Sequence, residues 1–267
     1  MTWSQVDRDT LLITSGRDPF VRFATSTELV AVAAEDGAGW ACVSPWRQGA
    51  AHWGGAAVVA PDAPPDAESQ ALQAIVDAAH DEVRLEWFST RDRRDLELPG
   101  HYVATGSGRW AFMWTERTAG VPLPQGLADQ DLELVELEDR ADAEHLEAFG
   151  QEHSDGPYQG FPGRGFATLW LAVRDREGST VAVGALHELA SGMPHLAGVV
   201  VRPASRGRGI GMLLTEALTA RAVEEAGVAT LGVDTDNQGA LRLYERLGYA
   251  TAHRFHTRDL GLVSQHP

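Results

Sequence analysis

The residues most able to do chemistry lie where an apolar stretch runs into a glycine-rich turn. The stretch is Val199 to Val201, and the turn, Arg206 to Gly211, is followed at once by an amphipathic helical pattern. A strand, turn and helix in this order bring free backbone N–H groups to the positive end of a helix dipole, and glycine has no Cβ to keep a phosphate at a distance. The pattern predicts an anion site suited to a pyrophosphate. Its residues are Val199, Val200, Val201, Arg206, Gly207, Arg208, Gly209, Ile210, Gly211 and Met212.

A second group of residues with chemical potential lies on the next predicted helix. It consists of Asn237, Ala240 and Tyr244, with a glycine closing the helix soon after them. Together with the glycine-rich turn, this group resembles the acyl-CoA-binding core of the Gcn5-related N-acetyltransferases, the GNAT superfamily.

The resemblance implies a role for each matching residue. Arg206, Gly209 and Gly211 would form the pyrophosphate loop, and the valine strand would pair with the pantetheine arm and offer an N–H to the thioester carbonyl. Asn237 would contact the CoA arm, and Tyr244 would be the general acid for the departing thiolate. The implied activity is transfer of an acetyl group from acetyl-CoA to a primary amine of a small molecule or peptide. A non-catalytic acyl-CoA-binding regulatory module is the alternative.

The general base is not evident, because many family members carry a carboxylate on the fourth strand and this chain has Ala197 and Gly198 there. Glu188, His195 and Asp234 are the candidates that remain close in sequence. Each also has a structural interpretation, since the first two flank a hairpin turn and the third can cap the following helix. Bulk water could also accept the proton.

The loop after the first helix of this half is expected to select the acceptor. Its polar residues are Glu152, His153, Asp155 and Tyr158. The carboxylates could pair with a cationic amine, but an acidic, glycine-rich loop is more often simply exposed.

Residues 130–260 are expected to follow the GNAT order β-α-β-β-β-α-β-α-β. Periodicity and turn residues predict strands at 132–137, 168–173 and 180–186, a strand ending at 201, and strands at 228–233 and 249–257. Helices are expected at 139–149, capped by Asp139, from 210 to about 226, and at 238–247.

The first part of the chain resembles a degenerate copy of the second. A strand at 54–60, a helix at 68–80 and a strand at 83–88 follow the same order, but Pro61 to Asp66 replaces the glycine-rich turn. Proline lacks an N–H and aspartate repels phosphate, so this part should not bind CoA. We therefore expect a mixed α/β chain of two GNAT-like domains, residues 1–120 and 131–267 joined by a linker at 121–130, each with a mostly antiparallel sheet flanked by helices.

Composition limits the other function classes. The chain has 267 residues, a net charge of −16 and a single cysteine, which argues against a nucleic-acid partner, a disulfide framework and a thiolate metal site. Without a membrane-length apolar run, we expect a cytoplasmic monomer or homodimer that contacts no membrane. A dinucleotide-binding oxidoreductase fits poorly, because the third glycine of its fingerprint falls on Met212. Seven of the eight tryptophans lie in the first half, where core filling is favoured over an aromatic acceptor pocket.

Overall fold

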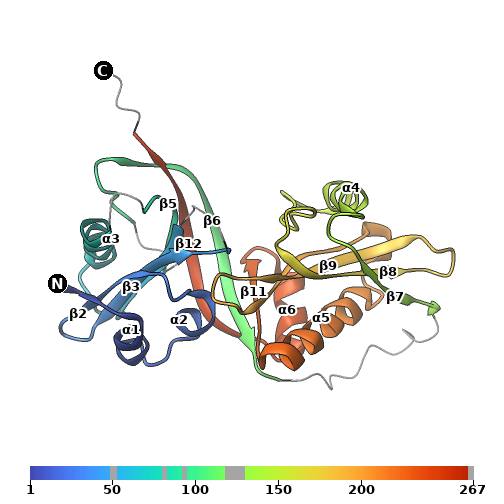
Figure 1. The fold of residues 1–267 in the computed structure, drawn as a ribbon, viewed down its shortest axis with the longest axis horizontal. Coiled ribbons are helices and arrows are strands. Elements are labelled where there is room, and N and C mark those ends of the chain that lie inside the picture. Colours follow the sequence, from blue (N-terminus) through green and yellow to red (C-terminus); the bar gives the residue numbers. More distant parts are fainter. Residues whose placement is uncertain (49–52, 80–82, 92–94, 118–129, 264–267) are drawn as a thin grey trace.

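The computed structural model describes residues 1–48, 53–79, 83–91, 95–117 and 130–263, and these form a mixed α/β structure around one twelve-stranded sheet (Figure 1). The N-terminal half, residues 1–117, contains β1 (Trp3–Val6), α1 (Arg8–Thr14), α2 (Pro19–Ala24), β2 (Val30–Ala34), β3 (Gly39–Pro45), β4 (Trp53–Val59), α3 (Ala67–Ala78), β5 (Leu85–Arg91) and β6 (Tyr102–Thr115). The C-terminal half, residues 130–263, contains β7 (Glu133–Leu137), α4 (Ala143–His153), β8 (Ala167–Arg174), β9 (Thr180–Glu188), β10 (Pro194–Val201), the short 3-10 helix η2 (Pro203–Ser205), α5 (Ile210–Ala226), β11 (Ala229–Asp234), α6 (Gln238–Arg246) and β12 (Ala250–Leu262).

The sheet joins the two halves by exchanging their last strands. Its order is β1-β2-β3-β4-β5-β12-β6-β11-β10-β9-β8-β7, so β6 pairs with β11 of the other half and β12 pairs with β5. The two exchanged strands also pair with each other and run side by side through the middle of the molecule (Figure 1). The predicted, mostly antiparallel sheet flanked by helices is confirmed, but its strands form one continuous sheet rather than two separate ones. The predicted linker at 121–130 lies outside the described residues, except for Gln130.

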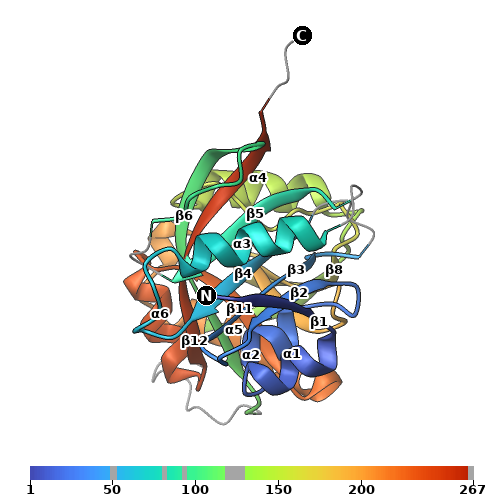
Figure 2. The same ribbon diagram turned by 90° about the vertical axis from the view of Figure 1, so that its left-hand side faces the viewer.

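Helices cover the faces of this sheet at both ends. In the N-terminal half, α3 lies across one face, where Leu72 and Ile75 are buried against β1 to β4 (Figure 2). The short helices α1 and α2 bury Leu11 and Phe20 in a separate cluster that also holds Phe112 of β6. Sequence analysis did not predict α1 and α2, because each spans less than three turns and gives a weak periodic signal.

The helix after the glycine-rich turn forms where its pattern predicted. Helix α5 buries Ile210, Leu214 and Leu218, which recur at helical spacing, against β8 to β11. It ends at Gly227, whose φ of 73° is in the left-handed region and whose N–H binds the carbonyl of Val223. The strand end at Val201 and the helix at 210–226 are thus confirmed.

The expected cap at Asp139 is a correction. Helix α4 begins at Ala143, and Asp142 is in the capping position, three residues later than the predicted cap. The Asp139 carboxylate instead accepts hydrogen bonds from Trp170 Nε1 (2.9 Å) and from the backbone N–H groups of Gly163 (3.1 Å) and Gly165 (2.9 Å). A residue of the right type for a cap therefore anchors the loop that follows the helix.

Candidate acyl-CoA site

The glycine-rich turn has the backbone conformation that an anion site requires. Gly207 and Gly209 have φ values of 76° and 85°, a region that other residues rarely adopt. Gly209 is the N-cap of α5 and offers no side chain to it, so the first N–H groups of the helix have no side-chain acceptor at that cap. The turn therefore presents backbone donors at the positive end of a seventeen-residue helix.

Strand β10 separates from its neighbour just before this turn. It is parallel to β11, but only two pairs form, His195 with Thr230 and Leu196 with Leu231. Beyond Leu196 the β10 strand continues to Val201 without pairing on that side. The backbone groups of this segment that face β11 are therefore available to another extended chain.

A bulge interrupts β10 at the point of separation. The register with β9 shifts between Ala197 and Val200, and Gly198 has a φ of 59°. Such a bulge turns backbone groups out of the ladder. An acyl chain running along β10 would meet N–H groups there that no strand uses.

Helix α6 contributes Tyr244 to the buried cluster that Val199 and Val201 of β10 pack against. Its side chain is buried, and burial raises the pKa of Tyr244 to about 12, which keeps the phenol protonated at neutral pH. Asn237 caps the helix, since its Oδ1 accepts the N–H of Ala240 at 3.0 Å. The side-chain amide nitrogen of Asn237 is then the group left for a ligand.

Arg206 connects the turn to the end of α4. Its Nη1 lies 2.9 and 3.1 Å from the Asp155 carboxylate oxygens, its Nη2 donates to the carbonyl of His153 (2.8 Å), and its Nε donates to the carbonyl of Val201 (3.0 Å). Asp155 is thus placed beside the glycine-rich turn by an ion pair. Glu152, the other predicted acidic residue of the loop, is exposed and lies 4.0 Å from the His153 ring.

Of the three base candidates, His195 lies at the apex where β10 and β11 separate. Thr230 Oγ1 donates its only proton to the carbonyl of Pro194 (2.8 Å), so the 3.0 Å contact to His195 Nδ1 requires the imidazole to be the donor. This leaves a lone pair on Nε2, which faces Gly232 of β11. Burial, with smaller effects from His187 and Arg47, lowers the pKa of His195 to about 3, so the lone pair is free throughout the neutral range.

The other two candidates are engaged on the surface. Glu188 is exposed at the end of β9, where its carboxylate accepts a hydrogen bond from Gln48 at 3.3 Å. Asp234 accepts the N–H of Asp236 at 2.7 Å, and its carbonyl accepts the N–H of Asn237 at 3.0 Å, so it stabilises the turn before α6. The position of Glu188 agrees with its structural interpretation, but the expected cap at Asp234 is wrong, because Asn237 caps α6.

The loop between α4 and β8 lies directly on the bulge. A Cβ at Gly198 would be 2.6 Å from Gly160 Cα and 3.1 Å from the hydroxyl of Tyr158. Tyr158 was predicted as a polar residue that contacts the acetyl-group acceptor. Its side chain points inward rather than to solvent, and its hydroxyl oxygen is buried.

Two residues that sequence analysis missed hold this loop in place. His187 Nε2 lies 2.9 Å from the carbonyl of Gly160, and its Nδ1 lies 2.9 Å from Arg47 Nη1. Arg47 belongs to the N-terminal half and stacks over Phe161 and Phe166 (4.8 and 4.4 Å). Histidine at an inward position of an otherwise apolar strand was a usable signal, whereas no local pattern marks Arg47.

The donor and acceptor chemistry of this chain fixes the tautomer of His187. Arginine can only donate and a carbonyl can only accept, so Nδ1 carries the lone pair and Nε2 the proton. Burial first, and the charge of Arg47 second, lower the pKa of His187 to about 4. A neutral imidazole therefore links the N-terminal half to the loop on the bulge.

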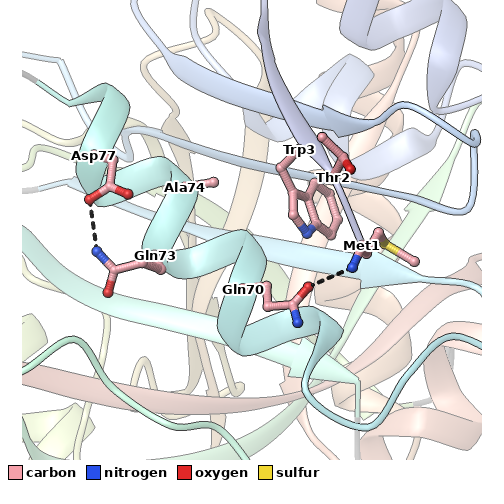
Figure 3. A pocket seen from close by; sticks show the side chains of 7 residues that line it. All are labelled: Met1, Thr2, Trp3, Gln70, Gln73, Ala74 and Asp77. Atoms are coloured by element: carbon pink, nitrogen blue, oxygen red, sulfur yellow. Dashed lines mark hydrogen bonds between the residues drawn. The ribbon is translucent and has the colours of Figure 1, made fainter.

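The corresponding place in the N-terminal half is closed. Strand β4 pairs with β5 at four positions, and the ring of Trp87 fills the space beside Gly54, where a Cβ would be 1.9 Å from the ring. No glycine of β4 has a positive φ. A separate hollow of about 450 Å³ lies between β1 and α3, lined mainly by Met1, Trp3, Gln70 and Gln73 (Figure 3). It shares no residue with the site in the C-terminal half.

Comparison with known proteins agrees with this geometry. Residues 134–249 match the acetyltransferase (GNAT) family. The matched segment contains the turn, the bulge, α5 and α6. Among the described residues, no helix is long and apolar enough to cross a membrane.

Individual relatives match part of the sequence or the fold. A mycothiol acetyltransferase of Rhodococcus jostii is 36% identical over 89 residues, which are 33% of this chain and 25% of that protein, so the match spans about a quarter of its length. A putative GNAT acetyltransferase structure from Novosphingobium aromaticivorans has a TM-score of 0.51 at 19% identity, covering 95% of this chain and 97% of its own. A Drosophila protein structure has a TM-score of 0.52 at 15% identity, covering 95% and 86%. These two structures have a similar fold over nearly the whole chain.

Proposed function

We propose that the chain is an acyl-CoA-dependent N-acetyltransferase that moves an acetyl group from acetyl-CoA to a primary amine. The observation that carries the proposal is a bulged β10 that separates from β11 after Leu196, combined with a left-handed glycine turn at the start of α5. A strand edge can pair with the pantetheine arm, and the helix start can hold the pyrophosphate. The family match over residues 134–249 supports the same chemistry.

In this mechanism the chain positions the thioester and stabilises the negative charges that develop on the carbonyl oxygen and on the departing sulfur. The lone pair of the amine nitrogen attacks the carbonyl carbon, and the carbonyl π electrons move onto the oxygen, where N–H groups of the β10 bulge stabilise the charge. When the tetrahedral species collapses, the C–S bond breaks. The phenol of Tyr244, which is protonated at neutral pH, then gives its proton to the departing thiolate.

We assign proton acceptance from the amine to His195. Its unprotonated Nε2 lies beside Gly232, at the apex where the two strands separate. Because burial makes this imidazole a weak base, it serves an amine that arrives neutral and becomes acidic only as the N–C bond forms.

We further propose that the N-terminal half is a degenerate copy that binds no CoA. The two halves have the same order of strands, α3 follows the fourth strand of one half as α5 follows that of the other, and Trp87 lies beside β4 at the place that corresponds to the proposed acyl site. The role of the N-terminal half is then to support the acceptor side through Arg47. The acceptor itself stays open, because the mycothiol acetyltransferase match covers too little of either chain to transfer its substrate.

A non-catalytic acyl-CoA sensor is the second candidate. It is favoured by one observation, the packing of Gly160 and Tyr158 on the bulge, where an amine would have to approach. A sensor would bind acetyl-CoA without transferring the acetyl group.

An amine screen separates the two candidates. The purified chain is incubated with acetyl-CoA and a panel of primary amines, and released CoA is detected with a thiol reagent. The chain adds little background because its only cysteine, Cys42, is buried. Release that depends on one amine and falls in Tyr244→Phe supports the transferase. Tight acetyl-CoA binding with no release from any amine supports the sensor.

A further inference from the structure

Tyr158 holds its hydroxyl in an unusual place for a loop residue. The residue lies between α4 and β8, and its ring packs against backbone at Gly150 and Gly160, where a Cβ would be 2.3 Å from the ring carbons or the hydroxyl oxygen. The hydroxyl reaches the bulge of β10, 3.1 Å from the Cβ position of Gly198. The two small residues therefore make room for a large ring that ends at the proposed acyl site.

This hydroxyl has no hydrogen-bond partner within the described part of the chain, although its oxygen is buried. A buried hydroxyl without a partner is destabilising, and a phenylalanine would fill the same space without that penalty. Burial, together with the nearby Glu147, raises the pKa of Tyr158, so the group stays a proton donor. Tyr158 therefore presents a hydrogen-bond donor at the bulge that no described residue accepts.

Several contacts prevent the loop from turning the hydroxyl away. His187 holds the carbonyl of Gly160 at 2.9 Å, and Asp139 binds the N–H groups of Gly163 and Gly165. These contacts come from β9 and from the segment before α4, which are parts of the rigid sheet and its flank. The donor is thus positioned before any ligand arrives.

We propose that the Tyr158 hydroxyl donates a hydrogen bond to the acyl oxygen of acetyl-CoA at the β10 bulge. The inference rests on the proposed function, because it requires the thioester to lie along β10. As the amine attacks, the carbonyl electrons move onto this oxygen and the hydrogen bond strengthens, while Tyr158 keeps its proton. Tyr158 then acts with the bulge N–H groups, and Tyr244 remains the proton donor to the thiolate.

The test compares acetyl-CoA with S-ethyl-CoA, a thioether that lacks only the carbonyl oxygen, and needs no acceptor. Calorimetric titration of the wild-type chain is expected to show tighter binding of acetyl-CoA. In Tyr158→Phe this preference falls by roughly three- to tenfold, as loss of one hydrogen bond implies. Affinity for S-ethyl-CoA stays within twofold.

A matched control is Tyr249→Phe. The hydroxyl of Tyr249 is buried like that of Tyr158, although its side chain is more deeply buried, and it bonds to Thr219 Oγ1 at 2.8 Å. Its loss should lower the urea midpoint of unfolding and leave the acetyl-CoA preference unchanged. Tyr158→Phe should leave the midpoint unchanged or raise it, since it removes an unsatisfied group.

The outcomes separate the inference from the proposed function. If the wild-type chain binds neither ligand, the proposed function fails. If it binds both, and Tyr158→Phe keeps the full preference for acetyl-CoA or weakens both ligands equally, Tyr158 does not bind the acyl oxygen and the inference is overturned.

Discussion

Replacing Gly198 with alanine tests whether the loop lies on the bulge of β10. The φ of 59° costs an L-residue about 1 kcal/mol. The added Cβ would also lie 2.6 Å from Gly160 Cα, an overlap that costs roughly 1–3 kcal/mol when neighbours must move. The free energy of unfolding should therefore fall by about 2–4 kcal/mol in Gly198→Ala.

Gly178→Ala is the matched control for this substitution. Gly178 has a φ of 76° in the turn between β8 and β9, and a Cβ there would meet no atom within 4 Å. Only the backbone term applies, so we expect a loss of about 1 kcal/mol. Urea unfolding followed by tryptophan fluorescence measures both variants, and calorimetry should show weaker acetyl-CoA binding only in Gly198→Ala. Equal destabilisation of the two variants would refute the contact between the loop and the bulge.

Three other predictions concern single groups of the site. Tyr244→Phe should lower kcat at least tenfold and leave the Kd for acetyl-CoA within twofold, and an unchanged kcat would show that Tyr244 is not the acid. The wild-type kcat should not fall with rising pH below pH 10, because the pKa of Tyr244 is raised to about 12. Asp155→Asn should tighten acetyl-CoA binding up to about fivefold in low salt, because it frees Arg206 from an exposed ion pair worth at most about 1 kcal/mol. The gain in affinity should vanish in 0.5 M NaCl, and weaker binding by the variant would mean that Asp155 helps to hold the ligand. Burial favours the neutral form of His195 in the folded state, where its pKa is about 3, whereas its unfolded pKa is 6.5. The contribution of His195 to the free energy of unfolding therefore falls by about 2 kcal/mol from pH 7 to pH 5. In urea unfolding, His195→Gln should lose correspondingly less stability over that interval, and an identical loss would place the titration elsewhere.

Local pattern was sufficient to predict the strand, the turn and the helix that would form the proposed CoA site. The glycine turn, the strand before it and α5 depend on residues next to one another, namely Gly209, the valines of β10 and the buried stripe of Ile210 and Leu214. Turn glycines and helical periodicity encode such features within a dozen residues.

The part of the site formed by the loop after α4 and by Arg47 could not be predicted, because long-range contacts determine it. Strands β6 and β12 have exchanged halves, and the sequence of a strand does not by itself predict which other strand it pairs with. Arg47 reaches His187 across 140 positions of sequence. The inward direction of Tyr158 depends on the absence of side chains at Gly150 and Gly160, a steric match that appears only in three dimensions.

The choice of a general base in the proposal shows a third limit. Sequence spacing gave Glu188, His195 and Asp234 equal standing, and only burial and hydrogen-bond direction separate them. The decisive contact is the hydrogen bond that the Thr230 hydroxyl donates to the carbonyl of Pro194, because it fixes which nitrogen of His195 carries the lone pair.

The most direct test of the central claim is calorimetric titration of the purified chain with acetyl-CoA, reading stoichiometry together with affinity. One site per chain, lost in Gly209→Glu because a carboxylate and a side chain would enter the left-handed turn, is the predicted result. No binding, two sites per chain, or normal binding by Gly209→Glu would contradict the assignment of the acyl-CoA site to the glycine turn and the bulged strand.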